Sequence, residues 1–180
     1  MTPSTGFQRL REDHRRVLDK IEVLETVAAA VPRVPARDWP GRDVLEVLAM
    51  LAIQFRTHMA AEEEVLYPAL AEALPATRSS LEPLEADHAS LRMMLSDLEL
   101  CLREPASRSR NETIAVQLRD LTDLLRIHIR TEEVVVFAVA ERVLSPMEIK
   151  TLADRVDRDA AKPARFTQRP GPGHSKGAST

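Results

Sequence analysis

The stretch HMAAEEEVLYPAL occupies residues 58–70, and HIRTEEVVVFAVA occupies residues 128–140. Each begins with a histidine, carries a glutamate four residues later and ends in an apolar run. In an α-helix this spacing places the histidine and the glutamate on one face, about 6 Å apart along the axis. The repeated phrase therefore predicts two helices that each present an imidazole beside a carboxylate.

The composition favours a soluble helical protein. Of 180 residues, 44% are hydrophobic, 29% are charged and only 3% are aromatic, and there are only five glycines, a balance that favours helices over sheets. The net charge of -3 gives no reason to expect nucleic acid or an anionic membrane as a partner. Residues 1–18 lack an apolar segment of signal-peptide length, and no uninterrupted apolar run approaches the roughly 20 residues of a membrane span. We expect a cytoplasmic protein.

Proline, glycine and capping residues divide the chain into helices. The expected long helices cover about residues 5–30, 42–73, 79–103 and 111–144, with Asn111 as the N-cap of the last. Ser145 and Glu148 form a capping box that opens a short fifth helix, and Pro68 should kink the second helix. The expected fold is all-α: an up-down-up-down four-helix bundle over 1–145, a short helix over 146–160 and a disordered tail over 161–180.

Each long helix carries an apolar stripe that should face the core of the bundle. After Glu62 the second stripe continues through Val65 and Ala69, and after Glu132 the fourth continues through Val135 and Val139. The only polar residues in the four stripes are histidines and glutamates: His14, His58, Glu62, His88, His128 and Glu132. These six side chains are therefore predicted to be buried.

Burial of two carboxylates creates an energetic conflict. An ionised carboxylate buried without a partner costs several kcal/mol, and a whole domain is stable by only about 5–15 kcal/mol. No lysine or arginine lies on any of the four stripes. A cation bound by imidazole and carboxylate resolves the conflict.

The two halves of the chain resemble each other. The pair Asp13-His14 in the first expected helix matches Asp87-His88 in the third, and the two His-x3-Glu phrases occupy the second and fourth. A duplicated helical hairpin would gather four histidines and two glutamates around a pseudo-twofold axis. This set predicts a cage for two metal ions with each glutamate bridging them.

Several residues near the stripes are not expected to bind a cation. Glu63, Glu64 and Glu133 fall off the stripes and are expected to be solvated. Tyr67 is expected to pack in the core, with a hydroxyl near the site as the minority alternative, and Phe137 occupies the matching place in the second half. The single cysteine, Cys101, cannot form an internal disulfide or a thiolate cluster.

Over about residues 7–144 this pattern resembles the hemerythrin-like family of His-His-Glu cation-binding domains. The resemblance implies a four-helix bundle with a non-haem diiron centre whose two irons share an oxo or hydroxo bridge. It assigns His14 and His58 to one iron and His88 and His128 to the other, and it makes Glu62 and Glu132 the bridging carboxylates. Manganese accepts the same imidazole and carboxylate ligands.

The sequence departs from the oxygen-carrying hemerythrins at two places. Those proteins have two histidines four residues apart on the third helix. In this chain the residues four positions before and after His88 are Leu84 and Arg92. They also end with His-x4-Asp on the fourth helix, so Glu133 remains an alternative to Glu132 as the second bridge. Fewer protein ligands leave the metals more open, and we expect reaction with a bound oxidant rather than reversible oxygen carriage.

The resulting hypothesis is a diiron protein that binds or reduces a small oxidant, namely dioxygen, hydrogen peroxide or nitric oxide. Whether it turns this ligand over as an enzyme is left open. One alternative is an iron- or oxygen-responsive sensor that a partner protein recognises. Another is repair of damaged iron–sulfur clusters, which members of the family with an N-terminal cysteine-containing segment perform.

Overall fold

The computed structural model describes residues 7–31 and 33–160, and every regular element within them is helical. The α-helices are α1 (Gln8–Ala30), α2 (Gly41–Ala61), α3 (Tyr67–Ala73), α4 (Arg78–Leu102), α5 (Arg108–Thr131), α6 (Phe137–Val143) and α7 (Pro146–Ala160). Two short π-helical segments, η3 (Glu62–Leu66) and η5 (Glu132–Val136), join α2 to α3 and α5 to α6, and the 3-10 turns η2 (Ala36–Asp38) and η4 (Pro75–Thr77) lie in connections. The all-α prediction is confirmed, and the predicted tail lies outside the described residues.

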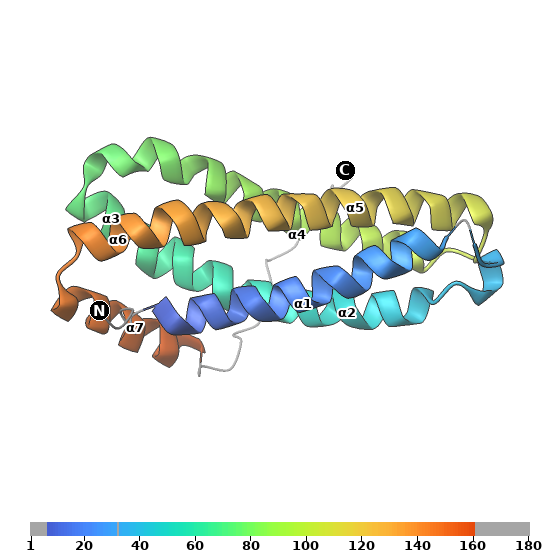
Figure 1. The fold of residues 1–180 in the computed structure, drawn as a ribbon, viewed down its shortest axis with the longest axis horizontal. Helices are drawn as coiled ribbons and strands as arrows, with labels where there is room; N and C mark the ends of the chain where they lie inside the picture. The colour runs from blue at the N-terminus through green and yellow to red at the C-terminus, as the bar shows by residue number, and fades with distance from the viewer. Residues whose placement is uncertain (1–6, 32, 161–180) are drawn as a thin grey trace, which may run out of the picture.

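The four long helices lie lengthwise against one another (Figure 1). Helix α1 contacts α2 and α5, and α4 contacts the same two neighbours from the other side. This closed set of contacts is that of a helical bundle, and the up-down-up-down order stays a prediction. Helix α7 packs against α2 and η3 near one end of the bundle.

The two π-helical segments begin at the glutamates of the repeated phrases. The backbone N–H of Tyr67 donates to the carbonyl of Glu62, and the N–H of Phe137 donates to that of Glu132, five residues back in each case. Pro68 follows the first segment, but the second forms without a proline, so proline is not the shared cause of the interruption.

The π turn of η5 displaces the apolar stripe that follows it. We expected Val135 and Val139 in the core, but Val135 is 47% exposed while Val136 and Ala140 are buried. A π turn holds one more residue than an α turn, so the core positions after Glu132 move one residue along the chain. The sequence pattern assumed regular α-helix and was wrong here for this reason. Val65, the first predicted position after Glu62, is buried as expected.

The ends of two helices test the capping predictions. Ser145 and Glu148 form the predicted capping box, in which the Ser145 N–H donates to Glu148 Oε2 and the Glu148 N–H donates to Ser145 Oγ. The Asn111 cap was wrong, because α5 begins at Arg108 and the hydroxyl of Ser107 caps it. Asn111 is buried inside the helix and its amide donates to the carbonyl of Ala36.

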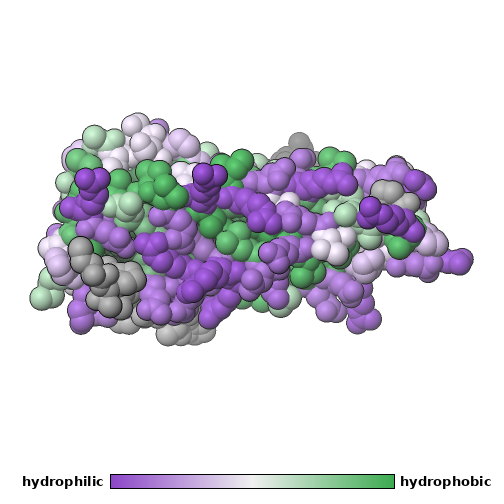
Figure 2. Space-filling view, viewed as in Figure 1, coloured by the Kyte–Doolittle hydropathy of each residue, from purple (hydrophilic) through white to green (hydrophobic). Residues whose placement is uncertain are grey.

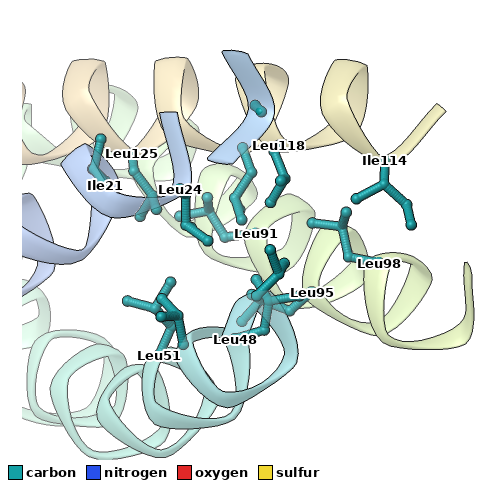
Figure 3. Close-up of a cluster of buried hydrophobic side chains, with 14 of the residues drawn as sticks. Ile21, Leu24, Leu48, Leu51, Leu91, Leu95, Leu98, Ile114, Leu118 and Leu125 are labelled. Carbon is teal, nitrogen blue, oxygen red and sulfur yellow. The ribbon is translucent and has the colours of Figure 1, made fainter. Parts of the chain in front are cut away.

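The apolar core consists of two clusters with the polar stripe residues between them. The larger cluster fills the bundle towards the end opposite α7; Figure 3 labels Ile21, Leu24, Leu48, Leu51, Leu91, Leu95, Leu98, Ile114, Leu118 and Leu125. The smaller cluster includes Phe7, Leu66 and Phe137 and extends to Ile149 and Val156 of α7. Close packing on both sides holds the elements that carry the histidines and glutamates at fixed separations.

One helical run passes a composition test for a membrane span. The continuous run Gly41–Ala73 is long and apolar enough, but 44% of its most apolar window is buried inside the protein. A buried bundle helix passes the same test, so this is weak evidence for a span. Hydrophilic side chains cover most of the face seen in Figure 2, with apolar patches between them.

Candidate metal centre

All six polar residues predicted on the stripes are buried and lie together. The fractional exposure of these side chains runs from 0% for Glu62, His88 and Glu132 to 8% for His58. Their ligand atoms form two overlapping groups, each within 4.8 Å. We call His14, His58, Glu62 and Glu132 the first cation position, and Glu62, His88, His128 and Glu132 the second.

The distances inside each group match the space around a cation. His14 Nε2 lies 2.9 Å from His58 Nε2, and His88 Nε2 lies 3.0 Å from His128 Nε2. Two ligands at right angles, each about 2.1 Å from an ion, are about 3.0 Å apart. The inward nitrogens of each histidine pair therefore sit where a shared cation requires them.

The carboxylates lie between the two positions. Glu62 Oε1 is 3.1 Å from His58 Nε2, and Glu62 Oε2 is 3.4 Å from His88 Nε2. Glu132 Oε2 is 3.0 Å from His14 Nε2 and 3.4 Å from His128 Nε2. Each glutamate thus faces one histidine of each position, as a bridging ligand does.

Three of the four carboxylate oxygens lack a hydrogen bond. Both oxygens of Glu62 and the Oε2 atom of Glu132 are buried without a hydrogen bond, and their polar neighbours are the inward imidazole nitrogens. An unpaired buried polar atom costs about 1–3 kcal/mol, and more when it is charged. The donor set, imidazole nitrogens and carboxylate oxygens with free lone pairs, suits a transition-metal cation.

The pKa values show how the metal-free site would hold its charge. Burial opposes the charged form of His58, but the carboxylate of Glu62 overcomes this and raises the pKa of His58 to about 10. Burial likewise opposes the ionised form of Glu62, yet the charge of His58 holds the pKa of Glu62 below its usual range. A proton on imidazole therefore stands where a cation would bind, and the two would compete.

The outward nitrogens of His14 and His88 contact glutamates that we expected to be solvated. His14 Nδ1 lies 2.9 Å from Glu133 Oε1, and His88 Nδ1 lies 2.8 Å from Glu63 Oε1. The expectation was wrong for Glu63 and Glu133 because each reaches a histidine on another helix, which the periodicity of its own helix does not reveal. Glu64 is exposed, as expected.

Arginines hold these two glutamates from outside. Arg11 donates to Glu133 and also to Glu141 at 2.9 Å, while Arg92 donates to Glu63 at 2.8 Å. Glu133 is thus engaged on the outer side of His14, whereas Glu132 lies between the cation positions. This geometry favours Glu132 over Glu133 as the second bridging carboxylate.

The outward nitrogens of the other two histidines face aspartates. His58 Nδ1 is 3.6 Å from Asp13 Oδ2, and His128 Nδ1 is 3.3 Å from Asp87 Oδ2. Burial opposes ionisation of Asp13, but the contact with His58 keeps the pKa of Asp13 below its usual value. The doublets Asp13-His14 and Asp87-His88 were the sequence signal for these partners, because each aspartate precedes a histidine of the site.

The residues at the matching positions 67 and 137 cover different cation positions. The Tyr67 ring stacks on His88 with ring centroids 6.0 Å apart, and the Phe137 ring stacks on His14 at 5.6 Å. The Tyr67 hydroxyl also donates to Glu132 Oε1, so Tyr67 is part of the site as well as of the core. Burial and the charges of Glu62 and Glu132 raise the pKa of Tyr67, which keeps the hydroxyl protonated as a donor.

Comparison with known proteins agrees with this geometry. The family model described as the hemerythrin HHE cation binding domain matches residues 5–140, more than two thirds of the chain. Searches of curated proteins and of solved structures found no match. The matched region contains the four histidines and two glutamates of the two cation positions. The chain belongs to the hemerythrin HHE cation-binding domain family.

Proposed function

We propose that this protein binds two iron ions in an up-down-up-down bundle and uses them to bind or reduce a small oxidant. The observation that carries the proposal is the set of three buried carboxylate oxygens without a hydrogen bond, two on Glu62 and one on Glu132, surrounded by four imidazoles. Iron and manganese both accept these ligands, and electron transfer to an oxidant favours iron. The oxidants that we propose are dioxygen, hydrogen peroxide and nitric oxide.

The distances support the following ligand roles. His14 and His58 would hold the first ion, His88 and His128 would hold the second, and the two glutamates would bridge them. The bound ions would supply electrons and an electrophilic centre for the oxidant. Glu63, Glu133, Asp13 and Asp87 would fix the histidine rings and raise the basicity of the ligating nitrogens.

The proposal is tested by loading the full-length chain with Fe²⁺ and measuring consumption of hydrogen peroxide and binding of nitric oxide. We expect both in the wild-type protein and neither in Glu62→Gln/Glu132→Gln. The matched control is Glu64→Gln, which changes an exposed glutamate next to the site and should behave as wild type. An iron-loaded wild-type chain that leaves both ligands unaltered would contradict the proposal.

A sensor function is the second candidate, and one contact favours it. Helix α7 packs against η3, the segment that begins with Glu62. Cation binding by Glu62 would change the stability of this segment and, through it, the docking of α7. Hydrogen exchange of α7 with and without Fe²⁺ tests this candidate, which predicts stronger protection in the iron-loaded chain and fails if the protection is equal.

A further inference from the structure

The two bridging carboxylates are not equivalent. Glu62 directs one oxygen to each cation position, Oε1 towards His58 and Oε2 towards His88. Glu132 faces both positions with the single atom Oε2, because its Oε1 accepts the hydroxyl of Tyr67. Glu132 therefore has one oxygen fewer to offer a cation than Glu62.

The hydroxyl approaches from the side of the second cation position. The Tyr67 ring lies against His88, so the oxygen that it engages would otherwise be available to the cation held by His88 and His128. The first position has no such donor at the matching place, because Phe137, which stacks on His14 and on Phe7, has no hydroxyl. A hydrogen bond to an ionised carboxylate is stronger than one between neutral groups, and here the donor is held in place by its stacked ring.

The surroundings of the two aromatic rings also differ. On the Tyr67 side, a cavity of about 550 Å³ lies between α3 and the first turns of α4, with Tyr67, Ala71, Arg78 and Leu81 in its wall. On the Phe137 side, the guanidinium of Arg11 lies 4.8 Å from the centre of the Phe137 ring and Phe7 stacks against its face. Tyr67 therefore has open space beside it, whereas Phe137 is covered on the outside by Arg11 and Phe7.

We propose that Tyr67 is a positioning residue that withholds Glu132 Oε1 from the metals, and so leaves a coordination position open to a small anionic ligand at the second cation. The proposal rests on the cation pair of the proposed function and adds where its ligand binds. Tyr67 acts through Glu132, and the hydroxyl is the feature that distinguishes the two halves. Removal of the hydroxyl frees Oε1 to ligate the second cation and to compete with the incoming ligand.

The test uses the full-length chain loaded with Co²⁺ and azide as the probe ligand. Cobalt per chain is measured by elemental analysis, the coordination of Co²⁺ by its visible absorption, and azide affinity by titration of that absorption. The variants are Tyr67→Phe, which removes only the hydroxyl, and Tyr67→Leu, which removes the hydroxyl and replaces the ring with an aliphatic side chain. The matched control is Phe137→Leu, which alters ring packing over His14 and touches no carboxylate oxygen.

We expect two Co²⁺ per chain in every variant. Both Tyr67 variants should bind azide about tenfold or more weakly and should absorb less strongly before azide is added, because the coordination number rises. The control should stay within about twofold of wild type. Unchanged azide affinity and absorption in both Tyr67 variants would overturn the role of Tyr67 while the cation pair stands. A wild-type chain that binds no Co²⁺ pair would overturn the proposed function and this inference together.

Discussion

The run α2–η3–α3 and the run α5–η5–α6 share the same sequence of site features. They differ at the aromatic position, which is Tyr67 in the first run and Phe137 in the second. Each presents a histidine, a glutamate four residues later and a π-helical segment that begins at the glutamate. The first run then places Tyr67 over His88 with its hydroxyl on Glu132, whereas the second places Phe137 over His14 with no hydroxyl.

The repeat determines where the ligand residues lie, whereas the residue at position 67 or 137 determines how one carboxylate is engaged. The shared spacing places imidazole and carboxylate at both cation positions, and neighbouring helices supply a carboxylate to each outward nitrogen. The aromatic position then decides how many oxygens the opposite glutamate can offer. A symmetric backbone can therefore hold two chemically different metal positions.

The largest effect should come from the carboxylates themselves. Glu62→Gln should weaken cation binding at both positions by more than about 100-fold, since loss of even an outer partner of a ligand costs about 10–100-fold. Glu132→Gln should have the smaller effect of the two, because Tyr67 already engages one Glu132 oxygen. Titration of each metal-free variant with Co²⁺, beside Glu64→Gln as the control, gives the ranking. Equal losses of Co²⁺ affinity in the two variants would show that the two carboxylates contribute equally, contrary to this prediction.

The glutamates on the outward nitrogens should rank next. Glu63→Gln should weaken binding at the second position, and Glu133→Gln at the first, by about 10–100-fold each. The amide keeps the shape of the side chain but removes the charge that supports His88 or His14. The same Co²⁺ titration measures both affinities. Unchanged Co²⁺ affinity in both variants would mean that these contacts do not support the metal ligands.

The metal-free chain should lose stability as the pH rises. The pKa of His58 is about 10 in the folded chain and 6.5 as its ordinary value, so its contribution is complete below about pH 6.5 and disappears as the pH passes about 10. The pKa of Glu62 is lowered, so its contribution is present above its ordinary value of 4.5 and is lost on acidification.

Urea unfolding of the metal-free chain from pH 4 to pH 10 measures this dependence. The free energy of unfolding should be highest between about pH 4.5 and 6.5 and should fall towards pH 10. His58→Gln should flatten the alkaline decline. A decline of the same size in His58→Gln would show that another group is responsible.

The smallest effect should come from the arginines that hold the outward glutamates. Arg92→Ala should lower the free energy of unfolding by less than about 1 kcal/mol, since Arg92 forms a partly exposed ion pair with Glu63. Arg11→Ala should cost more, because Arg11 contacts Glu133, Glu141 and the ring of Phe137. Urea unfolding of the two variants side by side checks the order, and a larger loss for Arg92→Ala would reverse it.

The sequence was sufficient for the helices, for most of the stripes and for the six buried polar residues, because each of these depends on periodicity along one helix. It was insufficient for Glu63 and Glu133, which leave their own stripe and reach a histidine on a neighbouring helix. Periodicity describes which face a residue lies on, but the reach of a glutamate across an interface depends on the distance between helices.

The η5 segment explains why Val135 was wrongly placed in the core. Neither Glu62–Leu66 nor Glu132–Val136 contains a proline or a glycine that would indicate a change of helix type. The extra residue per turn moved Val135 out of the core and brought Val136 in. A chemical feature shared by both segments is the buried glutamate at their start, so the irregular backbone coincides with the proposed bridging ligands.

The most direct test of the central claim is the number of cations bound per chain in the protein purified with Fe²⁺ present, measured by elemental analysis. We expect two per chain in the wild type and none in Glu62→Gln/Glu132→Gln. A folded, stable wild-type chain that binds no cation, or that releases a single one on dialysis, would contradict the claim, because the buried carboxylates would then be stabilised without metal.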